Sequence, residues 1–135
     1  MIAVLIHWRI KSDKRDETTN EDAFKSFWSK TAKVADRTGL IGEFLSKVEK
    51  STKETNLFWI TWHLDPESLG NATHYVNVGL WQNEVEFQKQ IAGYFNDSDE
   101  MKPFERYRRR RLLLRPELKR IGLAAFPTET SPGVD

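Results

Sequence analysis

The sequence predicts an α+β protein in which helices cover one face of an antiparallel sheet. Two segments, 2–10 and 74–81, alternate in side-chain character with the period of two that is typical of strands. Two others, 23–35 and 82–95, carry apolar residues three and four positions apart, as amphipathic helices do. Since each such element buries one face, the segments are expected to pack together in layers.

The composition indicates one domain with its own core. The chain has 135 residues, of which 39% are hydrophobic, with five Trp and eight Phe, and it has no Cys. Disulfides, thiolate nucleophiles and zinc fingers are therefore excluded, and the absence of Cys fits a reducing compartment. We expect a single domain at 1–126 and a flexible C-terminal tail at 127–135.

The N-terminus has no signal-peptide pattern, because the apolar run is interrupted by His7 and Arg9. No stretch of about 20 apolar residues is present, so no membrane span is expected. These observations predict a cytoplasmic protein that does not associate with a membrane.

The elements follow in order along the chain. After the first strand, short oxygen-bearing side chains at 19–22 favour the beginning of a helix, which Thr38 and Gly39 end. Residues 40–50 and 57–64 are interpreted as two consecutive strands, and Pro66 and Gly70 mark a loop before the strand at 74–81.

Three elements complete the chain: the helix at 82–95, a further short helix near Pro103 that carries Phe104, Tyr107 and Arg111 on one face, and a last strand at 121–126. The order is a ferredoxin-like βαββαβ plan with an extra strand or loop inserted between 50 and 73.

Four sequence phrases give the chain a resemblance to a known family: VLIHWRI, GLIGEF, YVNVGLWQNEVEF and PFERYRRRRLLLRPE. It resembles the antibiotic-biosynthesis-monooxygenase-like domains of the dimeric α+β barrel superfamily, which include cofactor-free oxygenases of polycyclic phenols and heme-degrading enzymes. The heme-degrading members carry an Asn on strand one, a Trp in helix two and a His beyond it. The corresponding positions here are Trp8, Gln90 and Glu100, and this departure disfavours heme degradation.

The residues that are candidates for chemistry lie on the predicted strands. His7, His63 and His74 are the only side chains with an ordinary pKa near neutrality, which makes them proton-transfer candidates. Alternation places Asn77 on one face with Tyr75 and Trp81, and His63 with Trp59. If these faces coincide, they form an aromatic-walled pocket. The predicted site consists of His63 and His7 as catalytic residues and Trp59, Tyr75, Asn77 and Trp81 as substrate contacts.

Each of these residues also has a structural interpretation. A His on a mixed strand face is commonly a hydrogen-bonded structural residue, and Trp side chains commonly fill cores and interfaces. The three His residues lack ligand spacing, so no metal site is predicted. The basic run 106–111 is interpreted as pairing with Glu84, Glu86, Asp97 and Asp99 rather than with nucleic acid, because the rest of the chain is net acidic.

The resemblance implies a cofactor-independent monooxygenase that acts on a small aromatic or polycyclic metabolite and uses no flavin, metal or nicotinamide. The alternative is a non-catalytic dimeric ligand-binding or scaffold protein of the same fold. An enclosed cavity lined by at least one His would favour the enzyme, and a filled barrel would favour the scaffold. A homodimer through the sheet is expected, because the face carrying Trp59, Tyr75 and Trp81 is too apolar for water.

Overall fold

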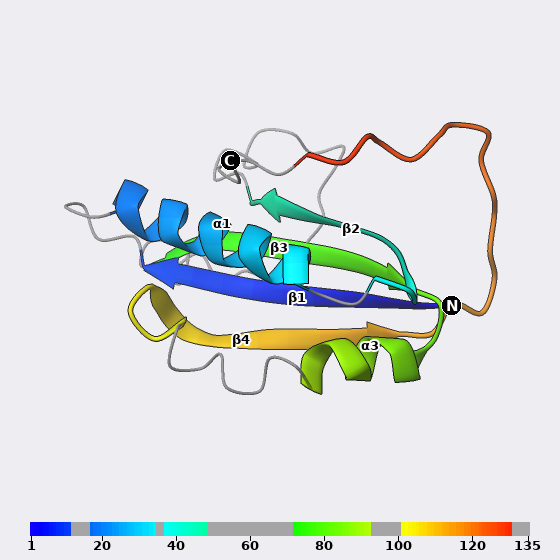
Figure 1. The fold of residues 1–135 in the computed structure, drawn as a ribbon, viewed down its shortest axis with the longest axis horizontal. Helices are drawn as coiled ribbons and strands as arrows, with labels where there is room; N and C mark the ends of the chain where they lie inside the picture. Colours follow the sequence, from blue (N-terminus) through cyan, green and yellow to red (C-terminus); the bar gives the residue numbers. More distant parts are fainter. Residues whose placement is uncertain (12–16, 35–36, 49–71, 93–100, 131–135) are drawn as a thin grey trace, which may run out of the picture.

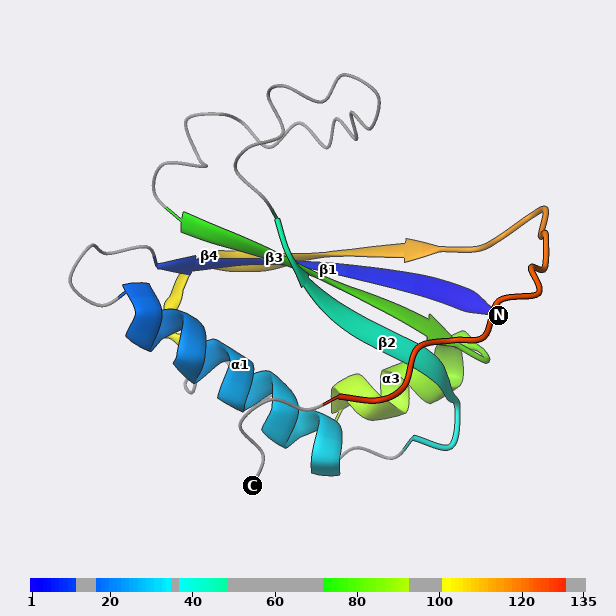
Figure 2. The same cartoon turned by 90° about the horizontal axis from the view of Figure 1, so that it is seen from above.

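The computed structural model describes residues 1–11, 17–34, 37–48, 72–92 and 101–130. Its elements are, in chain order, β1 (Ile2–Lys11), α1 (Glu17–Val34), β2 (Leu40–Lys47), β3 (Ala72–Trp81), α3 (Glu84–Ala92) and β4 (Glu105–Leu114). The strands form one antiparallel sheet in the order β2-β3-β1-β4 (Figure 1). Figure 2 shows that α1 and α3 lie on the same side of this sheet. The predicted ferredoxin-like α+β fold is confirmed.

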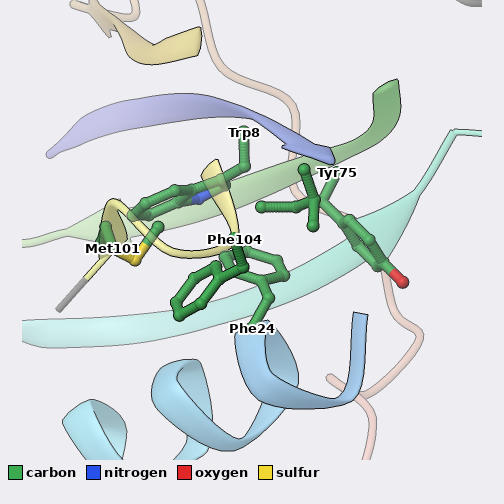
Figure 3. Close-up of a cluster of buried hydrophobic side chains, with 6 residues drawn as sticks. Trp8, Phe24, Tyr75, Met101 and Phe104 are labelled. Carbon is green, nitrogen blue, oxygen red and sulfur yellow. The ribbon is translucent and has the colours of Figure 1, made fainter. Parts of the chain in front are cut away.

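The even-numbered residues of β1 face the helices and contribute to both buried clusters of the core. Trp8 and Ile10 belong to a buried cluster with Phe24 of α1 (Figure 3). The rings of Trp8 and Phe24 are 5.2 Å apart and tilted, which is a favourable arrangement for aromatic pairs. Tyr75, Met101 and Phe104 complete the cluster. A strand with this alternation therefore turns one face toward the helices, and its C-terminal half packs against α1.

A second buried cluster lies at the other end of the sheet. Ile2, Val4 and Trp81 form it, and Phe87 of α3 packs against it with its ring 5.7 Å from that of Trp81. Gly39, which directly precedes β2, contacts α3 here: a Cβ added to Gly39 would lie only 2.2 Å from the Cβ of Glu86. This contact can form only with glycine at that position.

Two predictions at the C-terminal end were wrong. The segment after Pro103 is not a helix: residues 105–114 are the edge strand β4, which pairs antiparallel with β1. The segment 121–126 is not a strand but an irregular, exposed stretch. The fourth strand of the fold is therefore the Arg-rich segment 105–114, which occupies the sheet edge beside β1, and not the segment 121–126.

Other predictions lie outside the described residues. They include the strand at 57–64 with Trp59 and His63, and the insertion between 50 and 73 apart from the start of β3 at Ala72. The helix predicted at 82–95 is observed as α3 up to Ala92, and the strand predicted at 40–50 as β2 up to Lys47.

Candidate functional site

The predicted site residues lie on two opposite faces of the sheet. Tyr75 and Trp81 belong to the buried clusters on the helix-covered face, and Asn77 accepts a hydrogen bond from Trp28 of α1. His7 alternates with Ile6 and Trp8 and therefore projects from the opposite face. The prediction that Tyr75 and Trp81 lie on the face away from the helices was wrong.

His7 is paired with His74 of the neighbouring strand. The two rings stack with centroids 5.0 Å apart, and a 2.7 Å hydrogen bond joins Nε2 of His7 to Nδ1 of His74. Burial and, after it, the nearby His74, Arg9 and Arg110 together lower the pKa of His7 to about 4. An imidazole that resists protonation in this way is a weak proton acceptor at neutral pH.

A cavity of about 960 Å³ lies between α1, β2 and the C-terminal segment. Trp28 and Ser29 line it from α1, Tyr75 from β3, and residues 126–130 from the C-terminal segment. Glu43 and its neighbours on β2 form the remaining wall. A cavity of this volume is in the usual range for small-molecule sites, and its walls combine aromatic and aliphatic side chains with charged and hydroxyl-bearing ones.

A chain of hydrogen bonds ends at a carboxylate in this cavity. The indole Nε1 of Trp28 donates to Oδ1 of Asn77 over 3.0 Å, and Nδ2 of Asn77 lies 3.4 Å from Oε2 of Glu43, to which it donates. Burial raises the pKa of Glu43, although the bond from Asn77 and the charge of Arg37 both lower it. Because Trp28 fixes which end of the Asn77 side chain donates, the amide holds the Glu43 carboxylate in a defined orientation.

A second polar cluster anchors Tyr75. Its hydroxyl donates to Oε1 of Glu21 over 2.5 Å, and Nζ of Lys47 lies 2.8 Å from the same oxygen. In Figure 3 the Tyr75 hydroxyl points out of the aromatic cluster. Burial and the bond to Glu21 raise the pKa of Tyr75, so this phenol stays protonated and can act only as a hydrogen-bond donor or as a wall.

The structure therefore brings together only part of the predicted site. Tyr75 lines the cavity, and Asn77 contacts it only through its hydrogen bond to Glu43. Trp81 packs beside Phe87, and His7 projects from the other face. Trp59 and His63 lie outside the described residues. Sequence reasoning missed Glu43 and treated Trp28 as core filling. The available signal was the alternation of 40–47, which places Glu43 and Leu45 on the same face of the strand.

Within the described residues, no group of three or more His, Cys, Asp or Glu side chains is placed to hold a metal ion. No helix in the described part of the chain has the length and apolarity needed to cross a membrane.

The chain is similar to solved structures of monooxygenase-like proteins. It superposes on SnoaB, a cofactor-independent oxygenase from Streptomyces nogalater, with a TM-score of 0.52 and 12% identity over 87% of this chain and 94% of that one. An antibiotic biosynthesis monooxygenase aligns with a TM-score of 0.53 and 14% identity over 86% and 98% of the two chains. The chain has the fold of these oxygenases.

A dimeric ferredoxin-like protein from an uncultured marine organism is also similar, with a TM-score of 0.58 and 11% identity. The match covers 90% of this chain and 100% of that one. No protein-family model and no curated protein match the sequence. At these identities the likeness to this protein and to the two oxygenases shows the fold alone.

Proposed function

We propose that the protein is a cofactor-independent monooxygenase that oxidises a small aromatic or polycyclic phenol in the cavity between α1 and β2. The observation that carries the proposal is the oriented, partly desolvated carboxylate of Glu43 in an aromatic-walled cavity. The shared fold with a cofactor-independent oxygenase supports it. Lys25, Arg37 and Lys47 also line the cavity, and although Arg37 and Lys47 are paired with Glu129 and Glu21, their positive charges lie where a substrate anion would form.

In this mechanism Glu43 is the general base. Its carboxylate takes a proton from the bound phenol or from an activated ring CH₂, and the electron pair stays on the substrate as a delocalised anion. The anion reduces molecular oxygen and forms a C–O bond to it, and the proton returned by Glu43 gives a hydroperoxide. Loss of water, with the second hydrogen of the carbon, leaves a carbonyl group. One oxygen atom enters the product and the other leaves in water, while substrate carbon is oxidised.

The raised pKa of Glu43 is useful in this step. Phenols are weak acids, so a carboxylate with an ordinary pKa is a poor acceptor for their proton. Burial narrows the gap between the two pKa values, and the bond from Asn77 keeps the carboxylate in place while its protonation changes.

The test is oxygen consumption with anthrone in the presence of a chelator and without flavin, metal or nicotinamide. Glu43→Gln keeps the hydrogen bonding to Asn77 but removes the base, and is expected to lower kcat/KM by about 10²- to 10⁴-fold. Glu117→Gln, at an exposed position, is the matched control and should retain wild-type activity. His63→Ala and His7→Ala test the two predicted catalytic residues. A loss of that size in either His variant, with Glu43→Gln unchanged, would assign the base to histidine.

The cavity also serves the alternative function. Among the described residues, no His lines the cavity, so the expected mark of an enzyme, a His-lined cavity, is not met. The carboxylate of Glu43 lines it. A binding protein without turnover would bind anthrone derivatives in this cavity and consume no oxygen. Binding without oxygen uptake would therefore replace the enzyme by a ligand-binding protein.

We also propose that the protein forms a homodimer through the sheet face opposite the helices. One apolar row crosses all four strands on this face, because Phe44, Val78, Leu5 and Leu112 are successive partners in the register. Among the described elements Figure 2 shows no helix over this face, and Phe44 and Leu112 are exposed. A solved structure of the same fold is a dimer. The row is therefore the surface that a second copy would cover.

Charge placed in the middle of this apolar row should separate the subunits. Val78→Glu is expected to convert a dimer into a monomer of 15.8 kDa in multi-angle light scattering. Val85→Glu is the control, since Val85 is exposed on α3 and away from the row. A wild-type monomer at micromolar concentration, or a Val78→Glu dimer as stable as the wild type, would contradict the proposal.

A further inference from the structure

The C-terminal segment forms one wall of the cavity although it is far from it in the sequence. After β4 the chain runs past the N-terminal end of β1 and comes to lie beside β2 (Figures 1 and 2). Its part 126–130 lines the cavity together with Trp28 and Ser29 of α1. The part that leads there does not pack against the fold, since Leu118, Ile121 and Leu123 are 94%, 88% and 106% exposed. The segment therefore touches the domain mainly at its far end.

Two contacts hold this end, which we call the C-terminal wall (residues 126–130). The ring of Phe126 lies so close to Gly42 that a Cβ there would be 2.8 Å from Cζ of Phe126. Nη1 of Arg37 donates to both carboxylate oxygens of Glu129, over 3.0 and 3.1 Å. The side chains of this ion pair are 41% and 67% exposed, and exposed pairs shift an equilibrium by no more than about fivefold. Phe126 is itself 56% exposed, and its contact with Gly42 is what brings an apolar ring of this segment onto β2.

We propose that Phe126, seated on Gly42, determines which aromatic ligands the cavity accepts. The ring narrows the cavity at the wall that Gly42 and the C-terminal segment form, and a ligand too long for the remaining space has to displace it. The rest of the cavity is built on α1, β2 and β3, which are tied together by the sheet and the core. The C-terminal wall, which belongs to no helix or strand, is therefore the part of the cavity that selects ligands by size.

The inference rests on the proposed function only in taking the ligands to be phenols, and it is tested by binding rather than by turnover. Isothermal titration calorimetry measures the dissociation constants of 2-naphthol and of the longer 2-hydroxyanthraquinone. Phe126→Ala removes a contact for the small ligand and opens space for the large one. The ratio of the two dissociation constants, naphthol over anthraquinone, is expected to rise by about tenfold or more.

Two further variants separate size selection from a general loss of structure. Gly42→Ala leaves Phe126 in the sequence but pushes its ring away, so it should change the ratio in the same direction. Leu123→Ala changes a fully exposed residue of the same segment and should keep the wild-type ratio within about twofold.

A ratio unchanged in folded Phe126→Ala and Gly42→Ala, as judged by circular dichroism, would overturn the inference. So would an equal change in Leu123→Ala. If the ratio shifts as expected while neither the wild type nor any variant consumes oxygen with anthrone, the inference stands and the proposed oxygenase activity fails.

Discussion

The pairing of His7 with His74 predicts a loss of stability on mild acidification. In the native protein the pKa of His7 is about 4, compared with 6.5 for an unburied imidazole. As the pH falls through 6.5, the unfolded chain takes up a proton at this position and the native protein does not. The free energy of unfolding therefore falls, and it keeps falling until native His7 is itself protonated near pH 4.

The size of the effect follows from the two pKa values. The full difference corresponds to about 3 kcal/mol, and about 2 kcal/mol of it should be lost between pH 7 and pH 5. His7 is 9% exposed, so solvent screening reduces this figure only slightly. The groups that face the pair are Arg9 and Arg110, both cationic, and they oppose protonation throughout this range.

Urea unfolding followed by circular dichroism at pH 7, 6 and 5 measures the decline, at one protein concentration because a dimer's stability depends on it. His7→Asn keeps a side chain that can hydrogen-bond to His74 but cannot titrate, so most of the decline should disappear. A wild-type stability that does not change between pH 7 and 5 would refute the reasoning. An equally steep decline in His7→Asn would refute it as well.

Two further changes test the core and the cavity wall by their effect on the free energy of unfolding. Phe24→Ala removes a fully buried ring that packs against Trp8, Tyr75 and Phe104, and should lower the free energy of unfolding by about 3–5 kcal/mol. A decrease of less than about 1 kcal/mol would contradict this packing. Tyr75→Phe keeps the ring but removes the bond to Glu21, and should cost about 2 kcal/mol at pH 7 because the acceptor is charged; a neutral effect would show that Lys47 alone satisfies that carboxylate.

The sequence predicted the parts of the fold whose periodicity is unambiguous. The alternation of 2–10 identified the central strand, and the spacing of Phe24, Phe27 and Trp28 identified the helix over it. The segment 105–114 was misassigned because its run of Arg and Leu shows no strand alternation, whereas Phe104, Tyr107 and Arg111 suit one helical face. The strand forms because β1 has a free edge there, and a free edge is a property of the assembled sheet.

The site was predicted in part for a similar reason. Alternation correctly grouped Tyr75, Asn77 and Trp81 on one face of β3. It could not tell which face meets the helices, because the other face carries Val76, Val78 and Leu80 and is just as apolar. The helices pack on the aromatic face, where Phe24 and Phe87 contact its rings. That choice depends on complementarity between elements distant in the sequence.

β2 is where local rules and structure disagree most clearly. Phe44 is 46% exposed and is the partner of Val78 on the face away from the helices, whereas Glu43 accepts a hydrogen bond from Asn77 on the helix-covered face. If stability alone determined the pattern of β2, the aromatic residue would be buried and the carboxylate exposed, since burying a carboxylate is costly. The proposed functions account for both departures: Phe44 belongs to the apolar row that a second subunit would cover, and Glu43 needs a partly dry environment to act as a base. A single edge strand would thus serve the subunit interface with one face and the chemistry with the other, which is why its pattern is a poor guide to burial within one chain.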